Sequence, residues 1–142
     1  MNTPTQTQIL ERAVVHLQNG WVQGVSARDS AGNLVSELSP EAVVYCAMGA
    51  VTRAFVAVFR RGPACEELNA IVEPVARELY AYHPRGAVAA VVSCNDRTGT
   101  KQSDVVGAFQ AAIRKLKERE AGAERFVWPV DTYSLLRKEL VA

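Results

Sequence analysis

The amino-acid sequence predicts a mainly helical α+β domain, with four to five helices around one central apolar helix. Apolar residues recur at spacings of three and four along much of the chain, which is typical of helices with one buried face. Residues 42–59 are apolar on nearly every side, as in a helix at the middle of a bundle. A short alternating stretch followed by a turn adds a small β-hairpin, and a second apolar run adds one further short strand.

The first helix is predicted to end at Asn19. Its apolar face consists of Ile9, Leu10, Ala13, Val14 and Leu17. Thr5 or Thr7 can cap the N-terminus, because a hydroxyl oxygen accepts hydrogen bonds from free backbone N–H groups there. Asn19-Gly20 then supplies a left-handed stop.

The hairpin and the central helix come next along the chain. Residues 21–28 alternate weakly, residues 29–33 have turn composition, and residues 34–35 resume the apolar pattern. Ser39-Pro40-Glu41 predicts a helix start, because it combines a hydroxyl cap, a proline at the first helical position and an acid near the positive end of the helix dipole. The apolar segment 42–59 continues from that start.

The second half of the chain has three predicted elements. Residues 65–82 form a helix that Pro74 should kink or split. The apolar run 87–94 has the length and β-branching of a buried strand at 87–92, although its periodicity also permits a helix. The polar turn from Asn95 to Gly99 leads into a strongly amphipathic helix that ends near Gly122.

Charge and composition argue against several classes of protein. Lysine and arginine number 16 against 15 acidic residues, a net charge of +1, so we expect no general nucleic-acid binding. The three cysteines and two histidines are widely spaced, so we expect no metal site, and no cofactor is indicated. Thr52 and Arg53 interrupt the longest apolar stretch, which argues against a membrane span. The polar N-terminus does not resemble a signal peptide, so we expect a cytoplasmic protein with reduced thiols.

The length of 142 residues suits a single domain spanning 1–142, with its core in residues 5–122. The remaining element, residues 123–142, contains too many apolar groups to leave in water. We expect it to dock either on the body of the protein or on a second copy, as a homodimer. The candidate interface residues are Trp128, Tyr133, Leu136 and Leu140.

Two separated motifs resemble a known family. The first is Trp21-x-Gln23-Gly24-x-x-Ala27-Arg28-Asp29-x-x-Gly32, followed by Pro40-x-Ala42-Val43-x-Tyr45-Cys46-x-x-Gly49-Ala50, and the second is Asn95-Asp96-x-x-Gly99 with Asp104-Val105-Val106 further on. In this order and spacing they resemble DUF6197, a bacterial and phage family of unknown function, over residues 9–116. The resemblance implies a small cytoplasmic domain. It assigns no activity and no catalytic residue.

The chain departs from the family pattern at two places. Family members commonly have an aromatic residue before Asn-Asp, where this chain has Cys94. They often have Arg-Thr before the last helix, where this chain has Thr100-Lys101. If those groups contact a ligand in the family, that contact is altered here.

Asn95 and Asp96 form the first candidate ligand-binding cluster. They end a buried apolar run, and loops at the ends of such elements commonly carry binding groups. The alternative is structural, because asparagine and aspartate also hydrogen-bond to their own backbone in turns.

Trp21, Gln23, Arg28 and Asp29 form the second candidate cluster. An aromatic face, an amide and a guanidinium can together hold a planar or phosphorylated ligand. Alternatively, Trp21 fastens the hairpin to the first helix, and Arg28–Asp29 is an exposed turn pair of little energetic value. The ligand-binding interpretation gains if the two clusters meet in space.

The leading hypothesis is a small non-enzymatic binding module for a small polar ligand or a host protein. We assign no catalytic residue, since Cys46 lies in an apolar segment where burial raises a thiol pKa. The family resemblance suggests an accessory or counter-defence protein of a phage or mobile element. One alternative is a small enzyme for a nucleotide-like or phosphorylated metabolite, with Asp96 or Asp29 as base and Arg28 as anion clamp. Another is a purely structural interaction or oligomerisation domain that works through its tail.

Overall fold

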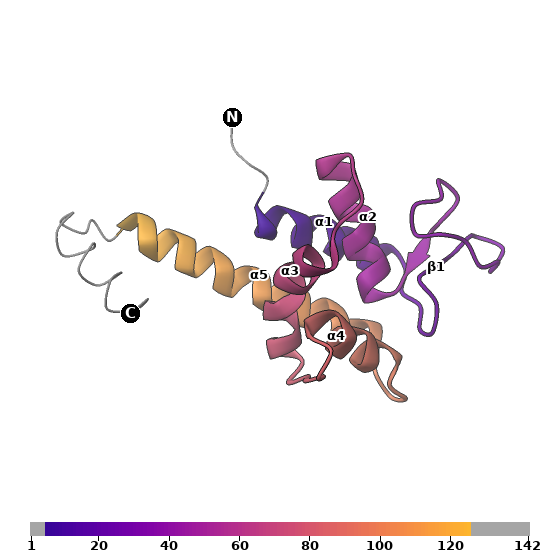
Figure 1. Cartoon of the computed structure of the whole chain (residues 1–142). Helices are drawn as coiled ribbons and strands as arrows, with labels where there is room; N and C mark the ends of the chain where they lie inside the picture. The colour runs from indigo at the N-terminus through magenta and orange to yellow at the C-terminus, as the bar shows by residue number, and fades with distance from the viewer. Residues whose placement is uncertain (1–4, 126–142) are drawn as a thin grey trace.

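The computed structural model describes residues 5–125, which contain five helices and one two-stranded sheet (Figure 1). In chain order the elements are α1 (Gln6–Asn19), β1 (Ala27–Arg28), β2 (Val44–Tyr45), α2 (Ala47–Phe59), α3 (Cys65–Glu78), α4 (Ala87–Asp96) and α5 (Gln102–Arg125). The mainly helical α+β class is confirmed. The predicted interface residues Trp128, Tyr133, Leu136 and Leu140 lie outside the described residues.

The core lies between α2 and the helices that surround it. α2 contacts α1 and α4, while α5 packs against α1 and α3. Phe55 of α2 and Phe109 of α5 are the largest fully buried side chains among the described residues. The buried faces of α1 and α5 follow the predicted spacing, because a helix that packs on one side buries positions three and four residues apart.

The end of α1 differs from the predicted left-handed stop. Gly20 follows the helix with φ 174° and ψ 135°, which is extended backbone that any residue adopts. A Cβ atom at this position would lie 2.5 Å from Cγ1 of Val44. Gly20 is therefore required for its small size, because β2 passes close to the end of α1.

The main partner of β1 is β2, and the predicted hairpin with residues 34–35 forms as a short antiparallel contact. β1 and β2 are antiparallel, with Ala27 opposite Tyr45. Leu34 forms an isolated antiparallel bridge with Arg28, and the N–H of Val35 donates to the carbonyl of Ala27 at 3.3 Å. The long-range pairing buries both Ala27 and Tyr45, which are 0% and 4% exposed, so tertiary packing selects the partner.

The central helix begins at Ala47, so the predicted start at Ser39-Pro40-Glu41 was wrong. The hydroxyl of Ser39 accepts from the backbone N–H of Glu41 at 3.2 Å, but this turn does not continue as a helix. β2 intervenes, and Cys46 becomes the cap, with Sγ accepting from the N–H of Gly49 at 3.2 Å. Pairing with β1 thus outweighs a good local helix-start signal.

α3 continues through Pro74 as one helix, so the predicted split was wrong. Proline lacks the N–H that would otherwise bond to the carbonyl of Ala70. Gln6 of α1 supplies the missing donor, because its Nε2 lies 3.0 Å from the oxygen of Ala70 and 3.1 Å from that of Ile71. A side chain from the neighbouring helix therefore satisfies the carbonyl that proline leaves free, and it also ties α1 to α3.

The segment predicted as a strand at 87–92 belongs to α4, which is a helix. Its buried residues are Ala90, Val91, Cys94 and Asn95, at helical spacing. Oδ1 of Asn69 in α3 accepts from the N–H of Val88 at 3.0 Å and satisfies a free donor of the first turn. This cap and the alanines of the segment outweigh the β-branching of its valines.

α5 runs past the bundle in Figure 1 and continues through Gly122, where the sequence predicted its end, to Arg125. It is tied to α1 by Gln102, whose Nε2 donates to the carbonyl of Leu17 at 2.6 Å. Over residues 5–125, none of the helices combines the length and the apolar composition needed to span a membrane.

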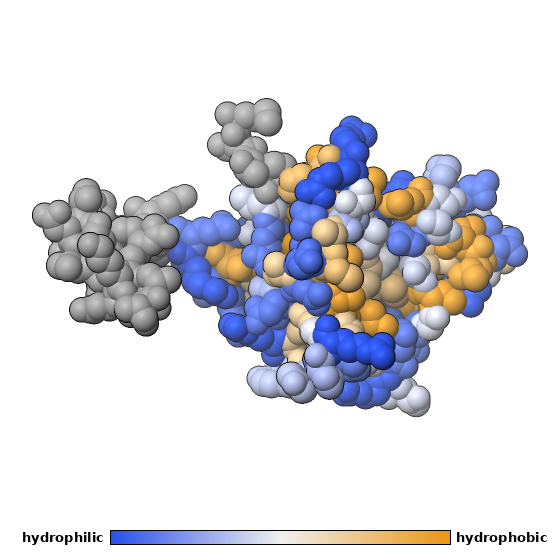
Figure 2. Space-filling model, in the orientation of Figure 1, coloured by the Kyte–Doolittle hydropathy of each residue, from blue (hydrophilic) through white to orange (hydrophobic). Residues whose placement is uncertain are grey.

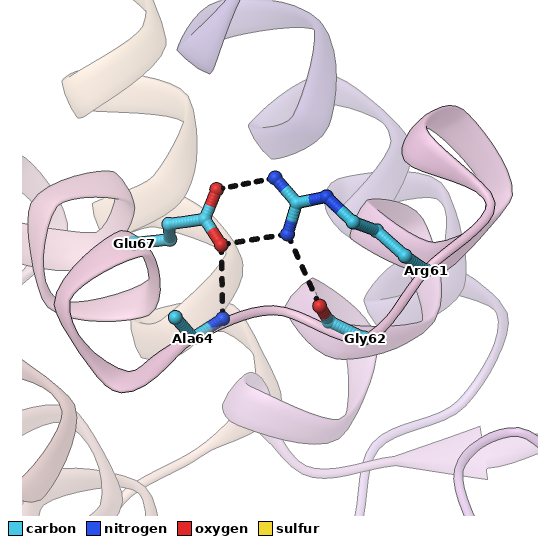
Figure 3. A network of polar contacts seen from close by, with 4 residues as sticks. All are labelled: Arg61, Gly62, Ala64 and Glu67. Atoms are coloured by element: carbon cyan, nitrogen blue, oxygen red, sulfur yellow. Dashed lines mark hydrogen bonds and ion pairs between the residues drawn. The ribbon is translucent and has the colours of Figure 1, made fainter.

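Arg61 and Glu67 close the corner between α2 and α3 (Figure 3). Two guanidinium nitrogens of Arg61 donate to the two carboxylate oxygens of Glu67 at 2.8 and 2.7 Å. The same carboxylate accepts from the N–H of Ala64 at 2.9 Å, so it also caps the first turn of α3. The hydrogen bonds from Arg61 are the main reason that the pKa of Glu67 is lowered to about 2.

Gly49, in the first turn of α2, permits a close approach to the chain before β1. A Cβ atom there would lie 2.3 Å from the backbone oxygen of Ser26. Gly49→Ala should destabilise the protein by about 2 kcal/mol, because the backbone must shift to relieve the clash. Gly107→Ala in α5 is the control, since nothing lies within 4 Å of its added Cβ, and it should stabilise by up to about 1 kcal/mol. Urea unfolding measures the free energy of unfolding of both variants. Equal changes in the two variants would contradict a close approach at Gly49.

The lowered pKa of Glu67 makes the α2–α3 corner sensitive to acid. The carboxyl has a pKa of 4.5 by itself and about 2 in the folded protein, so its stabilisation is complete above pH 4.5 and disappears as the pH falls toward 2. Glu67→Gln should flatten the fall in the free energy of unfolding over this range. Glu66→Gln makes the same change in net charge but keeps the Arg61 pair. Identical pH profiles for the two variants in denaturant titrations would contradict the assignment.

Candidate functional site

Asn95, at the C-terminal end of α4, is a buried amide whose hydrogen-bonding groups are all occupied. The residue is 1% exposed. Its Oδ1 accepts from Nε1 of Trp21 at 2.8 Å and from the N–H of Ala47 at 3.0 Å. Its Nδ2 donates to the carbonyl of Val22 at 3.2 Å and to Oδ1 of Asp96 at 2.9 Å. Two acceptor positions and two donor hydrogens complete the capacity of the amide.

The neighbouring side chains complete a network between residues 21–24 and the end of α4. Nε2 of Gln23 donates to the carbonyls of Asn95 and Arg97 at 2.9 and 3.0 Å, so it satisfies carbonyls at the helix end. The N–H of Gly24 donates to Oδ1 of Asp96 at 2.9 Å. Gly24 has φ 81°, a left-handed conformation that glycine adopts without steric cost. We name the side chains of Trp21, Gln23, Asn95 and Asp96 the Asn95 clamp.

The structure thus brings together four of the six predicted ligand-binding residues, and they bond to one another. The other two belong to the turn at 29–33. Nη1 of Arg28 donates to the carbonyl of Gly32 at 2.9 Å. Oδ1 of Asp29 accepts from the N–H groups of Ala31 and Asn33 at 3.0 and 2.8 Å, as the predicted turn requires.

The electrostatics of Asp29 and Cys46 disfavour a general base and a thiol nucleophile at these two positions. Hydrogen bonds from the backbone and side chain of Asn33 lower the pKa of Asp29, which makes its carboxylate a weaker base. Burial raises the pKa of the Cys46 thiol, as the sequence predicted, and so favours the unreactive protonated form. In the part of the chain that the structure describes, no three His, Cys, Asp or Glu side chains gather in a way that would hold a metal ion.

Sequence reasoning missed the backbone partners of the clamp. The N–H of Ala47 is a free donor at the start of α2, and its contact with Asn95 depends on a helix start that was misplaced. Gly24 and Gly49 lay within the first motif, and they were the available signal that a turn and a close backbone approach were needed.

The two departures from the family pattern lie together at the same corner. The hydroxyl of Thr100 donates to the carbonyl of Cys94 at 2.8 Å and so closes the turn that follows α4. Cys94 is buried. Thr100 therefore contributes to the connection between α4 and α5 through its hydroxyl, and Cys94 through its backbone carbonyl.

The fold and the clamp define a small helical α+β domain in which one buried asparagine joins the N-terminal half of the chain to the end of α4. The chain belongs to DUF6197, a family of unknown function, whose family model matches residues 1–115. That range includes every residue of the clamp and ends within α5. Comparison with curated proteins and with solved structures gives no match.

Removing the Asn95 amide tests whether its role is structural. Asn95→Ala leaves buried partners such as the Trp21 indole N–H and the Ala47 N–H without a bond, so it should lower the free energy of unfolding by about 3 kcal/mol. Ser93→Ala, on the exposed side of the same helix, should change it by less than about 0.5 kcal/mol. Urea unfolding measures both. If Asn95→Ala lowers the free energy of unfolding by less than about 1 kcal/mol, a ligand-binding role becomes the better explanation of this residue.

Proposed function

We propose that this domain is a protein-binding module whose contact surface is the loop between β1 and β2, residues 29–43. The observation that carries the proposal is that this loop exposes large apolar side chains, whereas the polar candidates for a ligand site bond to one another. Leu34, Leu38 and Val43 are 66%, 44% and 44% exposed. Clustered exposed apolar groups are typical of protein-interaction sites.

Backbone contacts place two of these residues on the two sides of Arg28. Leu34 bridges to Arg28 on one side, and the N–H of Val43 donates to the carbonyl of Arg28 at 2.9 Å. The two apolar residues therefore flank the same residue of β1. In Figure 2, apolar surface gathers over the loops beside β1, at the right of the view.

The loop is held in one conformation by contacts at both its start and its middle. Asp29 closes the first turn through its hydrogen bonds to the backbone of Ala31 and Asn33. Arg53 of α2 donates from Nη1 to the carbonyls of Glu37 and Ser39 at 3.4 and 3.2 Å. A surface fixed in advance loses less conformational entropy on binding, which favours affinity.

We extend this to the compartment of the protein and the kind of partner it binds. Cys46, Cys65 and Cys94 are free thiols, which supports a reducing, cytoplasmic compartment. The family resemblance supports a host protein as the partner of a phage or mobile-element accessory protein. A small polar ligand is less well supported, because Asn95 has no bonding capacity left and Arg28 and Asp29 serve their own turn.

Photo-crosslinking tests the proposed surface. A photoreactive amino acid at Leu34 or Leu38 should crosslink the full chain to a discrete host protein in cells, and Val43→Ser should reduce the yield severalfold. The same photoreactive residue at Val15 of α1, which is 56% exposed, is the control and should give no discrete product. Mass spectrometry identifies the partner and the crosslinked residue.

Two outcomes would contradict the proposal. One is an equal set of products from the loop positions and from Val15. The other is a metabolite that raises the melting temperature of the wild type but not of an Asp96→Ala variant, since binding to the folded state alone raises that temperature. The second outcome would restore the ligand-binding interpretation of the clamp.

A further inference from the structure

A second surface lies where the C-terminal end of α3 meets residues 79–86 and α5. α3 packs against both α4 and α5 (Figure 1). A cavity of about 290 Å³ lies between α3 and α4, and another of about 210 Å³ lies between α3 and α5. Arg77 lines both cavities, so they are neighbours on either side of one residue.

Each cavity has an exposed tyrosine on its wall. Tyr82 lines the cavity between α3 and α4 and is 88% exposed. Tyr80 lines the cavity between α3 and α5 and is 97% exposed. Tyrosine and arginine are enriched at the energetic centres of protein interfaces, because they combine a large contact area with directed hydrogen bonds.

Tyr80 also holds a backbone conformation that suits glycine. Its φ is 51°, in the left-handed region. The N–H of Tyr80 bonds to the carbonyl of Arg77 at 3.0 Å, and the N–H of Ala81 bonds to that of Ala76 at 2.9 Å. This is the Schellman arrangement of a helix end, in which glycine usually takes the left-handed position. A tyrosine that is 97% exposed gains little packing within the fold to offset the steric cost.

The two cavities differ in chemistry. Ala76, Ala81, Ala87 and Ala90 line the cavity between α3 and α4, so it accepts an apolar side chain. The cavity between α3 and α5 is lined by Arg77, Lys115 and Arg119. Arg77 pairs with Glu73 and Lys115 pairs with Glu78, so Arg119 is the cation of this lining outside those two ion pairs. Its guanidinium complements a carboxylate of a partner.

We propose that this surface binds an acidic peptide segment of a partner protein, and that it does so independently of the 29–43 loop. An apolar side chain of the peptide enters the alanine-lined cavity between Tyr82 and α3, while a carboxylate lies beside Arg119. Nucleic acid fits less well, because binding a run of phosphates depends on several cations, and Arg77 and Lys115 already have carboxylate partners.

Selection from a phage-displayed library of random short peptides tests the inference with the immobilised full chain. We expect enrichment of peptides that combine aspartate or glutamate with one large apolar residue. Fluorescence anisotropy with a selected peptide then measures affinity. Tyr82→Ala should weaken binding by roughly 30-fold, and Arg119→Glu by roughly 10-fold, less at high salt.

Tyr80→Gly separates binding from folding. It should raise the melting temperature by roughly 3 °C, because glycine adopts the left-handed conformation without strain, and still weaken peptide binding by roughly 10-fold. Arg60→Gly is the matched control: Arg60 ends α2 with φ 59° and lies outside both cavities. It should raise the melting temperature similarly and leave peptide binding unchanged.

Several results would overturn this inference. In the selection, these are a lack of enrichment over an uncoated support, or enriched peptides without acidic residues. In the later measurements, they are a peptide affinity that Tyr82→Ala and Arg119→Glu leave unchanged, or a melting temperature that Tyr80→Gly lowers. Binding of a fluorescent single-stranded oligonucleotide, lost in the same variants, would assign the surface to nucleic acid instead. Val43→Ser should keep peptide binding, so failure of the 29–43 loop proposal is distinguishable from failure here.

Discussion

The buried amide of Asn95 is the constraint on which the N-terminal half of the fold depends. A primary amide removed from water must find partners for its oxygen and both N–H hydrogens, because each unsatisfied group costs about 1–3 kcal/mol. Those partners come from Trp21, Val22, Ala47 and Asp96. Segments that are distant in sequence must therefore meet at one point. β1 and β2, of two residues each, are too short to fix this region by themselves.

The clamp also changes how polar motif residues should be interpreted. Trp21, Gln23, Asn95 and Asp96 have the chemistry of a ligand site, but every one of them has a partner inside the protein. Their hydrogen bonds within the fold account for these four polar side chains without any ligand. Residues that lack internal partners are better guides to binding. Apart from Val15 and Val92 on helices, the large exposed apolar and aromatic side chains of the described residues lie on two connecting loops.

Sequence periodicity predicted α1 and the buried face of α5, because each helix packs along one side and its pattern is local. It misassigned α4 because a short apolar run fits both a strand and a buried helix, and the deciding contact, from Asn69, comes from another helix. The two site clusters were identified from composition. Which residues of the two clusters meet was not predictable from the sequence. Trp21 bonds to Asn95 across 74 positions of the chain, whereas Arg28 bonds within its own turn, to Gly32.

Asn95 and Tyr80 show two ways in which a locally unfavourable residue is retained. The cost of burying Asn95 is offset inside the protein, where every polar atom of its side chain is bonded. The left-handed backbone of Tyr80 has no comparable compensation, because its ring is almost wholly in water. Arg60 ends α2 in the same left-handed region, so the backbone conformation alone does not indicate a partner. Tyr80 differs from Arg60 because it carries an almost wholly exposed aromatic ring, two positions from a second exposed tyrosine, Tyr82. The two exposed rings make the surface around Tyr80 and Arg77 a stronger candidate for recognition than the polar motif that first draws attention in the sequence.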